Sequence, residues 1–231
     1  MFFFNSSYLI YMLPAFILMA LTSWYVRSAY NKWGRVPARS RVTGYEAAQR
    51  LISRSGLYGV QIEGIAGEMT DHYDPRDKTL RLSRGVAQGG SVASLAIAAH
   101  ELGHAMQDSE DYLPLRFRAA LVPVVNIGSN LGWILIMAGL LLRWTDLAWL
   151  GVLVFAGGAV FALATLPVEL NASARARVLL RDTGLIQTDE EQRGVNTVLN
   201  AAALTYVAGL ITAILQLLYF ASLVGGSSRR R

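Results

Sequence analysis

The chain of 231 residues contains no cysteine, which excludes disulfide bonds and thiolate ligands for a metal ion. Histidine is nearly as scarce, with three in the whole chain. Charged residues make up only 16% of the sequence and hydrophobic residues 53%, which is too apolar for a soluble domain of this length. The composition therefore predicts a membrane protein, in which any metal site must use imidazole and carboxylate groups.

Four long apolar runs occur along the chain, each near the ~20 residues that cross the apolar core of a bilayer. They are residues 8–26, 119–142, 147–166 and 201–223. The first run has no basic segment before it and no clear cleavage site, so we expect a retained anchor instead of a signal peptide. The second run carries Pro123, Asn126 and Asn130, whose polar groups must face protein or water. We predict a multi-pass protein with about four transmembrane helices.

Positive charges favour one orientation of these spans. The net charge is +5, and arginine and lysine cluster between the first and second runs and between the third and fourth. The positive-inside rule places both of these segments in the cytoplasm, at the cell (inner) membrane, although the terminal arginines at 229–231 oppose this orientation. Because the basic residues border apolar runs instead of covering a soluble face, they indicate contact with the lipid bilayer and not with nucleic acid.

One short motif, H-E-L-G-H at residues 100–104, contains two of the three histidines. Four residues make slightly more than one turn of an α-helix, so His100 and His104 emerge on the same face and can share a metal ion. Glu101 is rotated off that axis and is placed to hold a water molecule on the metal. This pattern is typical of zinc metallopeptidases, in which the glutamate takes a proton from a zinc-bound water that attacks a peptide carbonyl. We predict that His100 and His104 bind Zn²⁺ and that Glu101 is the catalytic base.

Short patterns before the motif predict a small α+β region. Thr43 and Glu46 form the pattern of a capping box, at the start of a helix that stops at Gly56. A strand and a hairpin around the turn at 74–77 are predicted at residues 60–65, 68–73 and 79–82. Beside a metal, the edge of such a sheet commonly holds a peptide substrate as an added strand. The apolar residues 92–99 are too few to span a bilayer, so we expect the metal near the membrane surface.

A catalytic zinc site needs a third protein ligand and an open position for water. Glu169 is the best candidate because it follows Pro167, where we expect the third span to end or kink and a new helix to begin. Small side chains on the same face would let this helix lie close to the motif helix; they are Ala172, Ser173 and Ala176. The alternative is that Glu169 is an ordinary carboxylate at the start of a helix, stabilised by the helix dipole.

The remaining histidine, His72, lies in the predicted hairpin. It either donates to the oxyanion of a tetrahedral intermediate or is a hairpin residue without a chemical role. Tyr73 and Arg76 carry the same two alternatives. After the motif, residues 108–111 form an acidic turn that we interpret as a solvated helix exit.

Several stretches together resemble the YugP-like membrane zinc-dependent peptidases. They are RVPARSRVTGYEAA, DHYDPRDKTLRLS, AAHELGHAMQ, YLPLRFRAALVPVVNIGS and LPVELNAS, within residues 35–180. The resemblance implies an integral membrane metallopeptidase with His100, His104 and Glu169 as metal ligands and Glu101 as the catalytic residue. The plan is also similar to that of the HtpX-type proteases, in which an aspartate four residues after the ligand glutamate orients a metal-binding histidine. Ser173 stands at that position here, so that carboxylate is missing or supplied from elsewhere.

We therefore predict an α-helical integral membrane protein with a small zincin-like α+β catalytic region at the membrane surface. Its predicted segments are an anchor (1–26), a catalytic region (27–118), a transmembrane hairpin (119–166), a helix with the third zinc ligand (167–200), and a C-terminal transmembrane helix with a basic tail (201–231). The predicted function is a zinc endopeptidase that cleaves peptides or membrane proteins, in membrane protein quality control, with its site on the cytoplasmic side.

Two other functions stay open: an intramembrane zinc protease, if the metal lies deeper than the headgroups, and a non-catalytic scaffold stabilised by a metal. The intact Glu101 argues against the scaffold, because a structural site favours a closed fourth position. No pattern in the sequence predicts an oligomeric state.

Overall fold

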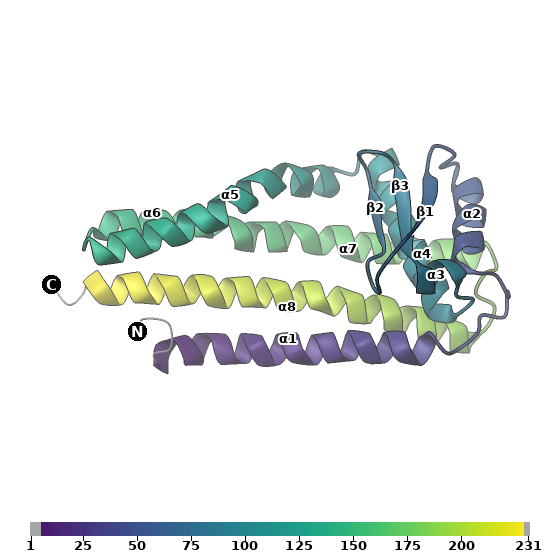
Figure 1. Cartoon of the computed structure of the whole chain (residues 1–231), viewed down its shortest axis with the longest axis horizontal. Coiled ribbons are helices and arrows are strands. Elements are labelled where there is room, and N and C mark those ends of the chain that lie inside the picture. Colours follow the sequence, from purple (N-terminus) through teal and green to yellow (C-terminus); the bar gives the residue numbers. More distant parts are fainter. Residues whose placement is uncertain (1–5, 229–231) are drawn as a thin grey trace. The chain divides into compact units, whose positions relative to one another are not determined.

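The computed structural model describes residues 6–228, so residues 1–5 of the predicted anchor and the arginines at 229–231 lie outside the described part (Figure 1). The helices are α1 (Ser6–Trp33), α2 (Gly44–Ser55), α3 (Arg84–Gln88), α4 (Val92–Ser109), α5 (Leu113–Leu141), α6 (Thr145–Phe155), α7 (Gly157–Asp182) and α8 (Asp189–Ser228). The strands are β1 (Gln61–Ile65), β2 (His72–Asp74) and β3 (Thr79–Ser83). The predicted combination of many helices and a small sheet is confirmed.

Four helical stretches are long and apolar enough to cross a membrane, as predicted. They are Ser6–Trp33, Leu113–Leu141, Thr145–Asp182 and Asp189–Gly226. At most 22% of the most apolar window of each stretch is buried inside the protein. Such exposure of apolar residues is expected where lipid, and not water, surrounds the helices.

The predicted helix start at Pro167 is wrong. Pro167 lies inside α7, which runs without a break from Gly157 to Asp182, and the third apolar stretch is instead divided before Gly157, where α6 gives way to α7. Proline removes one backbone donor, but neighbouring groups can compensate for this loss in a membrane helix. Glu169 is therefore not in a first helical turn, and the helix dipole does not account for its position.

Contacts divide the described chain into two units. The membrane unit comprises residues 6–22, 116–167 and 205–228, and the polar unit comprises residues 23–115 and 168–204. The borders lie near the ends of the predicted apolar runs. The polar unit thus holds both segments that were predicted to contain metal ligands.

In the membrane unit, α5 and α6 pack closely through small residues. A Cβ atom at Gly139 would lie 2.4 Å from the backbone nitrogen of Ala148, and one at Gly132 would lie 2.8 Å from that of Phe155. Small residues are typical of such contacts, because apolar side chains gain little by leaving lipid and helices associate through close packing. Further along the chain, the ring of Tyr219 on α8 lies 5.2 Å from that of Tyr8 on α1.

In the polar unit, α4 is the central helix. Its buried residues include Leu95, Ala99 and Leu102, which belong to one apolar core with residues of α2, β3 and α7. The capping box predicted for α2 is confirmed: Glu46 N–H donates to the Thr43 hydroxyl, and the Glu46 carboxylate accepts from Thr43 N–H. The packing of this core fixes the direction of α4.

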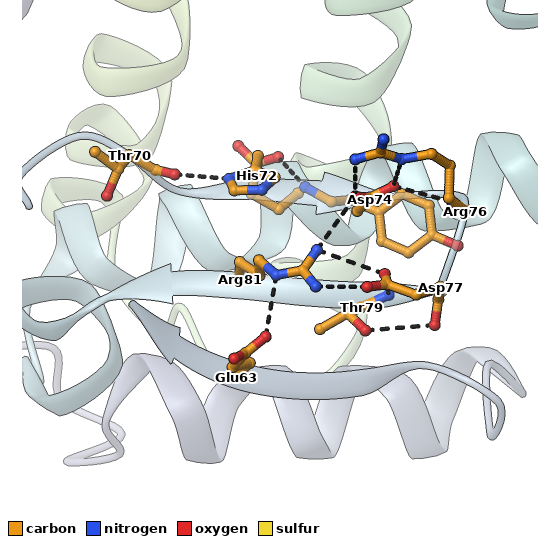
Figure 2. A network of polar contacts seen from close by, with 10 residues as sticks. Glu63, Thr70, His72, Asp74, Arg76, Asp77, Thr79 and Arg81 are labelled. Atoms are coloured by element: carbon orange, nitrogen blue, oxygen red, sulfur yellow. Dashed lines mark hydrogen bonds and ion pairs between the residues drawn. The ribbon is translucent and has the colours of Figure 1, made fainter. Parts of the chain in front are cut away.

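The three strands form a sheet in the order β1-β3-β2, with β1 parallel and β2 antiparallel to β3. On its outer face, Arg81 of β3 donates to the carboxylates of Glu63, Asp74 and Asp77 (Figure 2). Arg81 thus joins both outer strands and the hairpin turn to the central strand. These hydrogen bonds are strong because guanidinium–carboxylate pairs are charge-assisted.

The second strand is shorter than predicted, because it begins at His72 and not at residue 68. Gly67 and Met69 have positive φ angles of 103° and 56°. These angles lie outside the β region and bend the chain before it can pair with β3. β2 is left as a short edge strand beside α4.

Candidate metal centre

The helix α4 carries two of the groups of the site. It begins after Ser91, whose side chain accepts a hydrogen bond from the backbone N–H of Ser94. One turn of helix separates His100 from His104, and the centroids of the two rings lie 4.9 Å apart, edge to face. Both side chains are mostly buried, at 12% and 13% exposure. The predicted shared face of the two imidazoles is present.

The third group comes from α7. The Oε2 atom of Glu169 lies 3.3 Å from Nε2 of His100 and 3.4 Å from Nε2 of His104. Its side chain is only 3% exposed. The three ligand atoms lie within 4.8 Å of one another and could hold one metal ion. Two imidazoles and one carboxylate are a donor set that catalytic zinc uses, with a position left for water.

Close packing between α4 and α7 brings these groups together. A Cβ atom at Gly103 would lie 2.5 Å from the backbone oxygen of Ala172, and Ala172 and Ala176 are fully buried. Ala172, one of the small residues predicted to allow this approach, is therefore in contact with the motif helix. The distance from Glu169 to the two histidines depends on the absence of a side chain at Gly103.

We expect Gly103→Ala to destabilise the protein and weaken its zinc binding. Alanine favours a helix over glycine by about 1 kcal/mol, but overpacking costs about 1–3 kcal/mol, and more where the obstacle is backbone. Thermal unfolding in detergent and zinc content would measure both effects. Gly59→Ala is the control, since a Cβ atom at Gly59 has nothing within 4 Å. Equal stability of the two variants would contradict the proposed tight contact.

The other nitrogen of each imidazole has a hydrogen-bond partner. Nδ1 of His100 lies 3.2 Å from the hydroxyl of Ser173, and Nδ1 of His104 lies 3.0 Å from Oε1 of Gln107. Ligand histidines commonly bind the metal through one nitrogen and donate from the other to a fixed acceptor. The arrangement fits this pattern, because both Nε2 atoms face Glu169. Ser173, at the position predicted to lack a carboxylate, contacts His100, and Gln107 contacts His104.

Glu101 is held apart from the three candidate ligands. Its Oε2 atom accepts a hydrogen bond from the backbone N–H of Tyr73 on β2, at 3.2 Å. Burial raises the pKa of Glu101, while the nearby imidazoles of His100 and His104 act to lower it. A carboxylate with a raised pKa beside a metal site has the properties of a general base.

The structure places His72 outside the metal centre. His72 pairs with Arg81 in the strand register, and its Nδ1 lies 2.8 Å from the backbone oxygen of Thr70, on the outer face of the sheet (Figure 2). Arg76 is also on that face, bonded to Asp74. Tyr73, on the inner face, donates its hydroxyl to Asp108, so the segment after the motif is not merely a solvated exit.

Gln107 is a site residue for which no role was predicted from the sequence. Gln107 follows His104 by three residues, and residues at this spacing lie on the same side of a helix. A polar side chain on the buried face, next to a predicted ligand, was a usable signal. No sequence pattern indicates the contact of the Tyr73 backbone amide with Glu101, because this contact depends on the fold.

No solved structure matches the chain. A protein of Bacillus subtilis named "Putative membrane protease YugP" is 44% identical over 195 residues, which are 84% of this chain and 86% of that protein. A family described as "Putative neutral zinc metallopeptidase" matches residues 8–225, a range that contains the whole metal centre. The chain therefore belongs to this family of zinc metallopeptidases.

Proposed function

We propose that the protein is a membrane-embedded zinc endopeptidase with His100, His104 and Glu169 as metal ligands and Glu101 as the catalytic base. The observation that carries this proposal is the convergence of three metal-binding groups from two helices, beside a glutamate that is not among them. Membership of a zinc metallopeptidase family supports the same chemistry. The polar unit would then be the zincin-like catalytic region.

The reaction would be hydrolysis of a peptide bond. Zinc, when bound, polarises the carbonyl of the scissile bond and lowers the pKa of a water molecule. Glu101 would take a proton from the water whose oxygen adds to the carbonyl carbon, and would return it to the nitrogen as the C–N bond breaks. The Tyr73 amide holds one carboxylate oxygen of Glu101, which leaves the other oxygen for the proton.

An extended segment of a peptide or membrane protein is the substrate that the sheet would fit. β2 is an edge strand, and its Tyr73 amide points to Glu101 and not to β3. A peptide added along this edge would place its backbone beside the base and would be bound with little dependence on sequence. Binding that depends little on sequence suits the removal of unfolded membrane proteins, which is the role that we infer.

A site at the membrane surface is better supported than one within the bilayer. The ligands lie in the polar unit, close to the charged pair of Arg175 and Glu110. Charged side chains are costly in the bilayer core. A non-catalytic scaffold is less well supported, because structural zinc sites have four protein ligands and the described group has three.

The direct test is removal and return of the metal. A zinc chelator should abolish cleavage of an unfolded protein substrate by the purified protein in detergent, and stoichiometric zinc should restore it. Magnesium added to the same sample serves as the control, because it prefers oxygen ligands to imidazole. Cleavage that continues after complete loss of zinc would refute the proposal.

Reporter fusions test the side of the membrane. Fusions at Gly59 and Gly184 should both report the cytoplasm, and fusions at residues 143–146 the opposite side, because basic residues cluster in the first two regions. The metal centre also requires that both ligand-bearing segments share one side. If the reporters separated Gly59 from Gly184, Glu169 could not be a ligand.

A further inference from the structure

We propose that Gln107 is a positioning residue that fixes which nitrogen of His104 carries the proton, and that Asn171 and Arg175 fix the direction of the Gln107 amide. This inference rests on the proposed zinc site and deepens it. It concerns a chain of hydrogen bonds that runs from an ion pair at the surface to one candidate ligand. All of its members lie in the polar unit.

Gln107 links the two helices of the metal centre. Its side chain is fully buried on α4. Its Oε1 atom lies 3.0 Å from Nδ1 of His104, and its Nε2 atom donates to the backbone oxygen of Val168 at 2.8 Å and to Oδ1 of Asn171 at 3.0 Å. Val168 precedes Glu169 in α7. One amide thus contacts a candidate ligand on α4 and the residue beside another on α7.

The partners of Gln107 allow only one orientation of its amide. A backbone carbonyl can accept a hydrogen bond but cannot donate one, so the group that faces Val168 must be the NH₂ group. If the amide were turned over, two oxygens would meet in a buried place without a proton between them. Such a loss is costly for buried polar groups. The Oε1 atom of Gln107 must therefore face His104.

The side-chain amide of Asn171 is oriented by a second donor, Arg175. The guanidinium of Arg175 has only donors, and its Nε–H donates to Oδ1 of Asn171 at 2.8 Å. Arg175 is in turn held by Glu110, through two hydrogen bonds of 2.8 Å and 2.7 Å. The Oδ1 atom of Asn171 must then accept from both Arg175 and Gln107.

The consequence for His104 is a single tautomer. Facing an oxygen that can only accept, His104 must carry a proton on Nδ1, which leaves its Nε2 lone pair, on the side of Glu169, for the proposed zinc ion. His100 is different, because the hydroxyl of Ser173 can donate or accept. The chain of bonds thus fixes one of the two histidine ligands, whereas the other can adapt.

Zinc affinity of full-length variants in detergent tests this role. Gln107→Met keeps the length of the side chain but has no amide, and should lower zinc affinity by about 10–100-fold, as loss of such partners does. Asn171→Leu should also lower zinc affinity. Asn171→Asp retains an acceptor for both Gln107 and Arg175, and should bind zinc as tightly as the natural protein. Competition with a fluorescent zinc chelator would measure each affinity.

Arg177 provides a matched control on the same helix. It also donates to asparagine side chains, Asn196 and Asn200, but these lie on α8, and neither is hydrogen-bonded to a candidate ligand among the described residues. Arg175→Gln should weaken zinc binding, and Arg177→Gln should not. If both variants lowered the affinity equally, the effect of Arg175 would be a general loss of packing, and its positioning role would be refuted.

Histidine NMR tests the tautomer without any variant of the network. The chain has three histidines, so ¹⁵N-histidine labelling gives few signals, and His72→Gln removes the one outside the site. In the zinc-loaded protein, His104 should show a protonated Nδ1. Protonation of His104 on Nε2, or unchanged zinc affinity of Gln107→Met, would overturn the inference. Absence of peptidase activity alongside the expected tautomer would instead refute only the proposed function.

Discussion

Glu169→Ala should abolish both zinc binding and peptidase activity. Two neutral imidazoles would remain, and they leave a site that is too open and too weakly charged to hold zinc at cellular concentrations. The carboxylate of Glu169 is almost fully buried between the two Nε2 atoms, so no water-exposed group can replace it without rearrangement. The expected fall in zinc affinity exceeds the ~100-fold upper range for loss of an outer partner. Zinc content after purification would measure it.

Two further variants make this experiment specific. Asp182→Ala removes an exposed carboxylate at the end of the same helix and should leave zinc and activity unchanged. Glu169→Gln should retain the fold and bind zinc weakly, because the amide keeps the size of the side chain without its charge. Stoichiometric zinc in Glu169→Ala would show that another residue is the third ligand.

Glu101→Gln should keep its zinc but lose peptidase activity. The amide oxygen can still accept from the Tyr73 N–H, so the local structure is retained, but glutamine cannot take a proton from water. Loss of a general base typically lowers the rate by ~10²–10⁴-fold. The turnover rate on an unfolded substrate, together with zinc content, separates catalysis from binding.

Glu63→Gln is the control for Glu101→Gln. Glu63 lies on the outer face of the sheet and bonds to Arg81, away from α4 (Figure 2). It should retain full activity. Loss of zinc in Glu101→Gln would make Glu101 a ligand, and full activity in Glu101→Gln would end the proposed mechanism.

Short sequence patterns predicted the features that depend only on residues near one another in the chain. The capping box at Thr43 and Glu46 was evident because its two hydrogen bonds lie within four residues. The shared face of His100 and His104 followed from helix geometry alone. The four stretches that are long and apolar enough to cross a membrane followed from length and apolarity. In the first two cases the sequence contains both partners of the interaction within about one turn of helix, and the third depends only on the composition of a continuous stretch.

Other features depended on contacts that no short window contains. Pro167 was expected to begin a helix because its ring disfavours a helix interior, yet α7 continues through it. The proximity of Glu169 to the histidines was predicted from its small-residue face. Its closeness, however, depends on the contact between Gly103 and Ala172, and the direction of the Gln107 amide depends on its distant partners Val168 and Asn171. These are tertiary effects.

The three candidate ligands are separated in the chain by α5, α6 and the start of α7, and this has a consequence for biosynthesis. A ribosome makes the three strands, α4 and both histidines before it makes α5, α6 and the first part of α7, which precede Glu169. A nascent chain, or one truncated before α7, therefore carries both histidines but lacks the carboxylate of Glu169 and the α7 residues of the shared core. If this centre is the active site proposed above, the chain gains peptidase activity only after α5, α6 and the start of α7 have been made.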